Sequence, residues 1–103
     1  KDVLEKEVIA QEKKVMEKFF TLLAKEIEKT AYGKVAVEEA LNMGAVQLLL
    51  VSEELEDKDA EHFEELAKQV GAEIQIISVH TREGEQLKEL GGIAAILRYA
   101  INK

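Results

Sequence analysis

The feature that most constrains the fold is a nearly continuous apolar run, AVQLLLVS, over residues 45–52. Strands that are covered by helices on both faces have continuous apolar runs of this kind, whereas half-exposed strands alternate. Two more segments have strand character. In residues 73–79, Ile74 and Ile76 alternate with polar residues, and residues 93–99 form an apolar run after a glycine pair. These three segments predict the strands of a central sheet.

The longest predicted helix covers residues 1–29. Its apolar residues recur at helical spacing, which is typical of a helix with one buried face. The stripe is Met16, Phe20, Leu23 and Ile27, widened by Phe19 and Leu22. Before residue 14 the apolar residues thin out among charged ones. We therefore predict that residues 1–14 are a helical connector from a preceding domain and that residues 15–103 form one domain.

Three shorter helices are predicted between the strands. Asp57 or Asp59 is available to cap the third helix, and Thr81 can cap the fourth. Residues 30–33 (TAYG) are predicted to be a very short strand or a turn. The alternation of helices and strands predicts an α/β fold in which the sheet lies between layers of helices. The predicted C-terminal glycines of the three helices are Gly44, Gly71 and Gly91.

Composition excludes several classes of function. The net charge is −7 and the chain has no cysteine, so it has no thiolate metal ligand, disulfide or cysteine nucleophile. An acidic protein binds nucleic acids weakly, because proteins bind the phosphates through Lys and Arg. No signal peptide or membrane-spanning run is present, and we expect a soluble cytoplasmic protein. The glycines match neither phosphate-binding loop pattern, and no cofactor-binding motif is found.

Four residues are candidates for a binding surface. Arg98 and Tyr99 follow the last apolar strand, and both residue types are enriched in binding hot spots. The alternative is that Arg98 pairs with a local carboxylate and Tyr99 packs on the first helix. His80 and Arg82 follow another strand, at the end where open α/β sheets bind ligands. His62, among glutamates, is interpreted as solvated surface. No catalytic or metal-binding set is predicted.

Three segments together resemble one known family. They are AYG (31–33), EEALNMGAVQLLLVSEEL (38–55) and GEQLKELGGIAAILRY (84–99). In this order and spacing they resemble the C-terminal domain of Pelota, a ribosome-rescue factor of the class-1 release factor superfamily, and the resemblance indicates an archaeal origin. The equivalent release factor domain carries an inserted minidomain after the second strand. Here only a short acidic loop and a helix separate Val51 from Ile74, which favours Pelota.

The resemblance implies a three-layer α/β/α fold with a small mixed sheet, similar to kink-turn-binding ribosomal proteins. It also implies a non-enzymatic docking domain that binds a translational GTPase of the elongation-factor family. The ribosome and the iron–sulfur ABC-type recycling ATPase are then partners of the full-length protein. Direct RNA binding is not expected, since Lys34 is followed by Val35, Ala36 and Val37 where RNA-binding relatives carry polar and basic residues. The alternatives are a release factor domain, a kink-turn RNA-binding module, and a small enzyme that uses His80.

Overall fold

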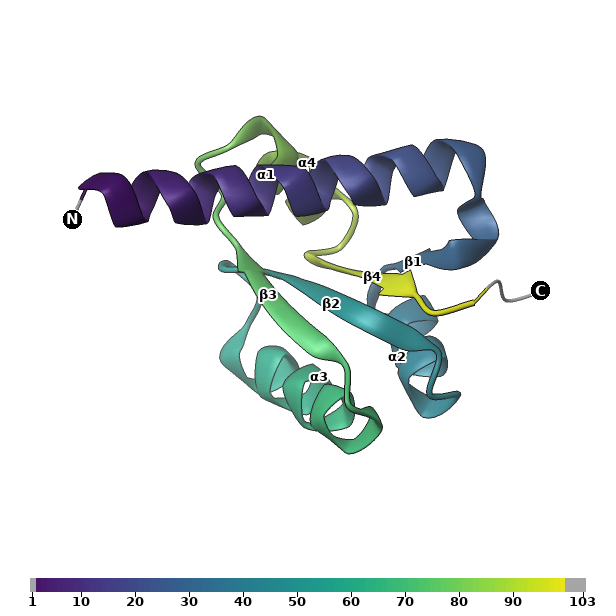
Figure 1. Cartoon of the computed structure of the whole chain (residues 1–103). Helices are drawn as coiled ribbons and strands as arrows, with labels where there is room; N and C mark the ends of the chain where they lie inside the picture. The colour runs from purple at the N-terminus through teal and green to yellow at the C-terminus, as the bar shows by residue number, and fades with distance from the viewer. Residues whose placement is uncertain (1, 100–103) are drawn as a thin grey trace.

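A single sheet and the helices on its two faces make up the described part of the chain. The structure is a computed structural model, which describes the backbone of residues 2–99 and the side chains of residues 12–99. Its helices and strands alternate along the chain, as predicted (Figure 1). The elements are α1 (Asp2–Lys25), the 3-10 helix η1 (Ile27–Lys29), β1 (Thr30–Tyr32), α2 (Lys34–Asn42), β2 (Val46–Ser52), α3 (Asp57–Val70), β3 (Glu73–Ile77), α4 (Arg82–Glu89) and β4 (Ile93–Leu97).

The sheet is mixed, with the strand order β1-β4-β2-β3. β2 and β3 are parallel, and α3 makes the crossover between them. β4 lies in the middle of the sheet and is antiparallel to both β1 and β2. Leu49 of β2 therefore pairs with Ile74 on one side and with Ala95 on the other. Because β4 is antiparallel to β2, the last residue of β4 lies beside the first residue of β2.

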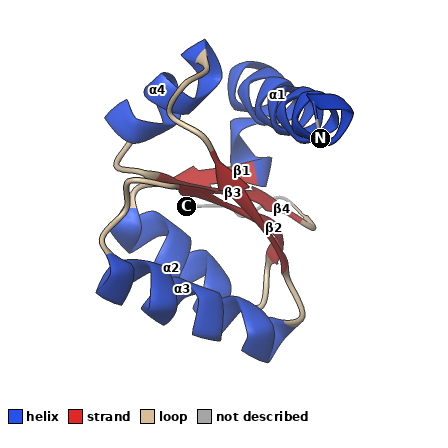
Figure 2. Cartoon of the chain, turned by 90° about the vertical axis from the view of Figure 1, so that its left-hand side faces the viewer, coloured by secondary structure: helices blue, strands red, loops and turns tan. Residues whose placement is uncertain are grey.

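Two layers of helices cover the sheet, which confirms the predicted three-layer arrangement. In Figure 2, α1 and α4 lie on one face and α2 and α3 lie on the other. Successive strand residues point to opposite faces, so each central strand supplies two cores. Leu49 and Val51 of β2 face α2 and α3, whereas Leu50 faces α1 and α4. This two-sided burial explains why residues 45–52 contain so few polar side chains.

The long N-terminal helix is anchored by Met16 and Phe19, which are fully buried against Leu50, Leu87 and Ile96. Fully burying a side chain of this size contributes about 1.5–3 kcal/mol, so these two residues hold α1 on the sheet. Phe20, predicted to lie in the centre of the stripe, is only partly buried. The prediction that residues 1–14 form a connector stays a prediction, since the side chains before residue 12 lie outside the described part.

The predicted single helix over residues 1–29 is wrong at its end. α1 ends at Lys25, and η1 follows after Glu26. The break lies at Glu26, whose φ of −138° and ψ of 66° are not helical. The backbone N–H and hydroxyl of Thr30 then both donate to the carbonyl of Ile27 and close η1, and Thr30 adopts the extended conformation that begins β1. Ile27, predicted to belong to the buried stripe, is instead 57% exposed.

Two predicted strands also end early, and one predicted cap is wrong. β3 ends at Ile77 rather than at residue 79, and β4 ends at Leu97 rather than at residue 99. The N-cap of α3 is Glu56, with no side-chain cap bond, instead of Asp57 or Asp59. Both aspartates lie in the first turn, where negative charge complements the helix dipole. Within residues 2–99, no helix is long and apolar enough to span a membrane.

Candidate docking surfaces

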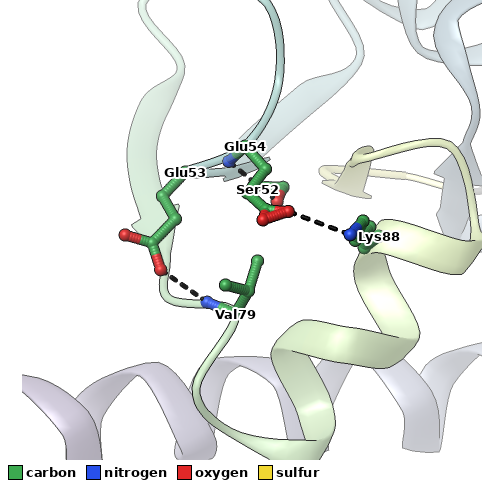
Figure 3. A network of polar contacts seen from close by, with 5 residues as sticks. All are labelled: Ser52, Glu53, Glu54, Val79 and Lys88. Carbon is green, nitrogen blue, oxygen red and sulfur yellow. Dashed lines mark hydrogen bonds and ion pairs between the residues drawn. The ribbon is translucent and has the colours of Figure 1, made fainter.

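The carboxyl end of the parallel strand pair is closed by carboxylates that accept backbone hydrogen bonds. Glu12 of α1 is buried and accepts from the N–H of Ser78 at 2.6 Å. Glu53, just after β2, accepts from the N–H of Val79 at 2.7 Å, as Figure 3 shows. The Val79 N–H bonds to this side chain rather than to backbone, so the pairing of β3 with β2 does not continue past Ile77. Together the two bonds fix the segment that leads into α4.

The same carboxyl end carries two more polar contacts, shown in Figure 3. Lys88 of α4 pairs with Glu54 at 2.9 Å, and the backbone N–H of Glu54 donates to the Ser52 hydroxyl at 3.2 Å. The bond from the Val79 N–H, followed by that from the Ser78 hydroxyl, lowers the pKa of Glu53 below its usual range. The bond to Glu54 raises the pKa of Lys88. Each shift favours the charged form that makes the contact.

α4 begins immediately after this segment and packs directly on it. Thr81 caps the helix by accepting from the N–H of Gly84 at 3.0 Å, as predicted. Gly84 is buried, and a Cβ at this position would lie 1.7 Å from the carbonyl oxygen of Ser78. Only glycine allows this approach of helix and loop.

His80 lies in the segment between β3 and α4, and Arg82 is the first residue of α4; both are exposed. The backbone N–H of His80 donates to the Ser78 hydroxyl at 3.2 Å. Neither side chain makes a hydrogen bond or ion pair with another described residue. Within the described side chains, no group of three or more His, Asp or Glu residues is placed to hold a metal ion. The geometry here is that of a fixed surface loop presenting a histidine and an arginine.

Arg98 lies at the opposite end of the sheet and holds backbone carbonyls. Its Nε donates to Val46 at 3.0 Å, and its Nη2 donates to Val70 at 3.0 Å and to Gly71 at 3.2 Å. Val70 and Gly71 end α3, where unpaired carbonyls and the helix dipole favour a cation. Among the described residues, the predicted carboxylate partner of Arg98 is therefore wrong. The guanidinium joins the start of β2 to the end of α3.

The alternative prediction, that Tyr99 packs on the first helix, is wrong. Its hydroxyl donates to the carbonyl of Met43, just after α2, at 3.4 Å, and its side chain remains about half exposed. The four predicted binding residues thus form two pairs at opposite ends of the sheet. His80 and Arg82 follow β3, whereas Arg98 and Tyr99 follow β4, which runs in the other direction. The structure does not bring them together into one site.

A groove that sequence reasoning missed lies between β1 and α2. We call it the β1–α2 groove, and its volume is about 650 Å³. Ile27, Tyr32 and Met43 line it and are large apolar side chains that remain exposed. The only sequence signal was the position of Ile27, at the end of a helical stripe whose other members are buried or partly buried. The other lining residues are Glu28, Thr30, Ala31, Ala36, Glu39, Ala40 and Leu97.

The outer surfaces of α2 and α3 are joined by charged pairs. Lys34 binds Asp59 at 2.8 Å, and His62 contacts Glu38 at 3.2 Å. The hydrogen bond to Asp59 raises the pKa of Lys34, and the same bond lowers the pKa of Asp59. Lys34, the first residue of α2, is therefore paired with a carboxylate of α3.

Comparison with known proteins identifies the class. The family model for eRF1 domain 3 matches residues 9–101. The chain therefore belongs to the eRF1 domain 3 family, the third domain of a class of translation factors. Within this family it is similar to Pelota. It is 45% identical to the protein pelota homolog of Pyrococcus horikoshii, over 90% of this chain and 27% of that protein.

Solved structures agree with this assignment. Archaeoglobus fulgidus Pelota matches 99% of this chain and 33% of its own, with 30% identity and a TM-score of 0.87. The predicted resemblance to the C-terminal domain of Pelota is confirmed. The chain spans about a quarter of the length of the curated Pelota homologues that it matches.

Release factors are also similar: the solved structure of the archaeal translation termination factor aRF1 is 41% identical with a TM-score of 0.78, over 87% of this chain and 26% of its own. The chain is 34% identical to peptide chain release factor subunit 1 of Methanosphaera stadtmanae, over 97% of this chain and 35% of that protein. That alignment extends over 143 positions, more than the 103 residues present here, whereas the alignment with the Pyrococcus homologue covers 97. The release factor thus contains residues that this chain lacks, as expected for an inserted segment.

Two further structures are named with their partners. One is a model of ribosome-bound archaeal Pelota and ABCE1, which is 33% identical with a TM-score of 0.83 and covers 95% of this chain and 28% of its own. The other is Saccharomyces cerevisiae Dom34, described as a translation termination-like factor that interacts with Hbs1. It is 29% identical with a TM-score of 0.81, over 91% of this chain and 28% of its own.

Proposed function

We propose that this chain is a non-catalytic docking domain of a ribosome-rescue factor and that it binds a translational GTPase of the elongation-factor family. One observation carries the proposal: the chain matches Pelota homologues along nearly its whole length without the extra residues of the release factor. The structures of ribosome-bound Pelota with ABCE1, and of Dom34, which interacts with Hbs1, support such partners. A cytoplasmic location follows from this role.

The chemistry of the described surface supports docking rather than catalysis. The two histidines lie on different elements, His62 on α3 and His80 after β3, and among the described residues neither imidazole makes a hydrogen bond to a serine or aspartate side chain. The acidic balance of the chain complements a basic partner. Direct RNA binding is not part of the proposal, because Lys34 is neutralised by Asp59.

Isothermal titration calorimetry tests the proposal. The full-length protein that carries this chain is titrated with the purified GTPase, loaded with a non-hydrolysable GTP analogue, and the same protein without residues 12–99 serves as the control. We expect micromolar or tighter binding that weakens at least tenfold when the domain is deleted. Equal binding by both proteins would contradict the proposal.

A gel-shift experiment with a structured kink-turn RNA separates docking from RNA binding. At physiological salt we expect no shift at micromolar concentrations of the chain, because phosphate binding needs clustered cations. A shift in this range would favour the RNA-binding alternative. A GGQ peptide-release motif in the sequence that encodes the full-length protein would favour the release factor alternative.

The four predicted binding residues remain proposals. Tyr99, His80 and Arg82 are exposed and available for contact. Arg98 already donates to three backbone carbonyls, so its replacement would change the stability of the domain as well as any interface.

A further inference from the structure

The exposed apolar side chains are concentrated at one end of the molecule. Six large apolar residues are exposed in the described part of the chain. Ile27, Tyr32 and Met43 line the β1–α2 groove. Tyr99 lies next to it, since its hydroxyl donates to the carbonyl of Met43. Val35 lies on the same face of α2 as Glu39 and Met43, since the spacing is i, i+4, i+8. The sixth, Ile76, lies on β3 at the other edge of the sheet.

The shape of this surface suits inserted side chains better than an added strand. β1 is an edge strand of only three residues, and the backbone N–H of Thr30 already bonds to Ile27. Such a short edge offers little backbone for another strand to pair with. The groove beside it has a volume of about 650 Å³ and is lined mainly by apolar residues. It can hold one or two large side chains from a partner.

The charges at the groove select among possible occupants. The charged lining residues are Glu28 and Glu39, and both are acidic. A second copy of this chain would bring these carboxylates close to their own symmetry mates, and each copy carries a net charge of −7. A phosphate backbone would be repelled in the same way. A protein segment that combines an apolar side chain with Lys or Arg complements both the apolar lining and the negative charge of Glu28.

We propose that the β1–α2 groove, with Val35 and Tyr99 at its margin, is the surface through which this domain docks its protein partner. The partner segment inserts an apolar side chain between Tyr32 and Met43 and places Lys or Arg over Glu28. This inference rests on the proposed docking function and adds the surface and the chemistry of the bound segment. In Figure 1, β1 and α2 lie at the opposite end of the molecule from the first turn of α1.

The first test compares Met43→Lys with Ile76→Lys in the full-length protein. The two side chains have similar exposure, 54% and 45%, but lie on opposite edges of the sheet. Binding of the GTPase is measured by calorimetry, and circular dichroism checks that each variant is folded. We expect Met43→Lys to weaken binding at least tenfold, because it puts a cation where an apolar side chain and cations must bind. Ile76→Lys should bind within twofold of the wild type.

The second test addresses the charges. Glu28→Lys is compared with Glu65→Lys, which makes the same charge change on the exposed surface of α3. We expect Glu28→Lys to weaken binding of the GTPase about three- to tenfold. Adding salt should lower the affinity of Glu28→Lys less than it lowers the affinity of the wild type. Glu65→Lys should bind as the wild type does, with an unchanged salt dependence.

A photo-crosslinking amino acid in place of Tyr32, with Ile76 as the control position, then identifies the bound segment. The crosslinked partner peptide should contain Lys or Arg next to an apolar residue. An acidic peptide, or equal crosslinking from Ile76, would overturn the proposal.

The outcomes separate this inference from the proposed function. Wild-type binding that Met43→Lys and Glu28→Lys leave unchanged would overturn the groove as the docking surface while the docking function stands. If the wild-type protein does not bind the GTPase at all, the proposed function fails and the inference falls with it. A wild-type chain that dimerises in sedimentation experiments, and is monomeric as Met43→Lys, would identify a second copy as the occupant and overturn the proposal.

Discussion

At the two ends of the sheet, side chains of opposite charge make hydrogen bonds to backbone groups. At the carboxyl end of β2 and β3, two carboxylates from different elements, Glu12 and Glu53, each accept one backbone N–H. At the other end a single guanidinium, that of Arg98, donates to three backbone carbonyls. The first arrangement divides the bonds between two side chains, and the second gives them all to one. The domain should therefore depend more on Arg98 than on either glutamate.

This difference also limits what residue type says about function. Arg98 is of a type enriched in binding hot spots, yet the three hydrogen bonds of its guanidinium are within its own domain. The exposed apolar side chains beside β1 make no comparable contribution to the fold. Charged residues at strand ends are hence weak evidence for an interface, whereas exposed apolar residues at one edge are stronger evidence.

The largest loss of stability is expected at Gly84, which packs against the Ser78 backbone with no space for a side chain. In Gly84→Ala, the new methyl group would lie 1.7 Å from the Ser78 carbonyl oxygen, which belongs to backbone held by Glu12. We expect a loss of about 3 kcal/mol in the free energy of unfolding, measured by urea denaturation. Gly44→Ala is the control, because its φ of 68° is strained but nothing lies within 4 Å of the new Cβ. It should lose about 1 kcal/mol. Equal losses would show that α4 does not press on Ser78.

A smaller loss is expected from Arg98→Ala, which removes every bond of the guanidinium to Val46, Val70 and Gly71. Because the site is partly open to water, we expect about 1.5 kcal/mol. Arg98→Lys keeps the charge near the end of α3 but cannot reach all three carbonyls, so it should recover part of this loss. Arg82→Ala is the matched control and should change stability by less than about 0.5 kcal/mol. If Arg82→Ala costs as much as Arg98→Ala, the proposed dependence on Arg98 is wrong.

The smallest effect is a change in pH dependence at Glu53. The Val79 N–H holds the pKa of Glu53 below its usual range, so the unfolded chain binds more protons than the folded one in acid. The stabilisation is present above the ordinary glutamate pKa of about 4.3 and is lost as the pH falls through the lower folded pKa. Glu53→Gln cannot titrate. We expect the stability of the wild type to fall more steeply than that of Glu53→Gln between neutral pH and pH 3. Parallel pH profiles would rule out this bond.

The three-layer fold could be predicted because the spacing of apolar residues along the sequence indicates which faces of the strands and helices are buried. The run at residues 45–52 required helices on both faces of β2, and these helices are present. The C-terminal glycine of α3 and the Thr81 cap depend on local backbone chemistry, so they too were predicted correctly. The ends of elements were less predictable. β3 ends where the Val79 N–H bonds to the Glu53 side chain, and the adjacent Ser78 N–H bonds to Glu12, which lies 66 residues earlier in the chain.

The candidate site was harder to predict for the same reason. Arg98 stood out by type and position, but its partners are carbonyls, which every residue carries and no sequence pattern marks. The β1–α2 groove forms from η1, β1 and α2, and Ile27 lines it because the helix α1 has already ended at Lys25. A helical periodicity continued through that point assigns Ile27 to the core. The site depends on where the helix stops rather than on a motif.

The position of β4 in the sheet has a consequence for how the chain is made. β4 is the last of the described strands in the sequence, yet it lies between β1 and β2 and pairs with both. β1 has no other strand partner among the described residues, so it cannot join the sheet until residues 93–97 are available. During synthesis, α1 through α4 would emerge from the ribosome before the sheet could close. Assembly of this domain therefore waits for nearly its whole length, and its apolar strand β2 is the surface to protect in the meantime.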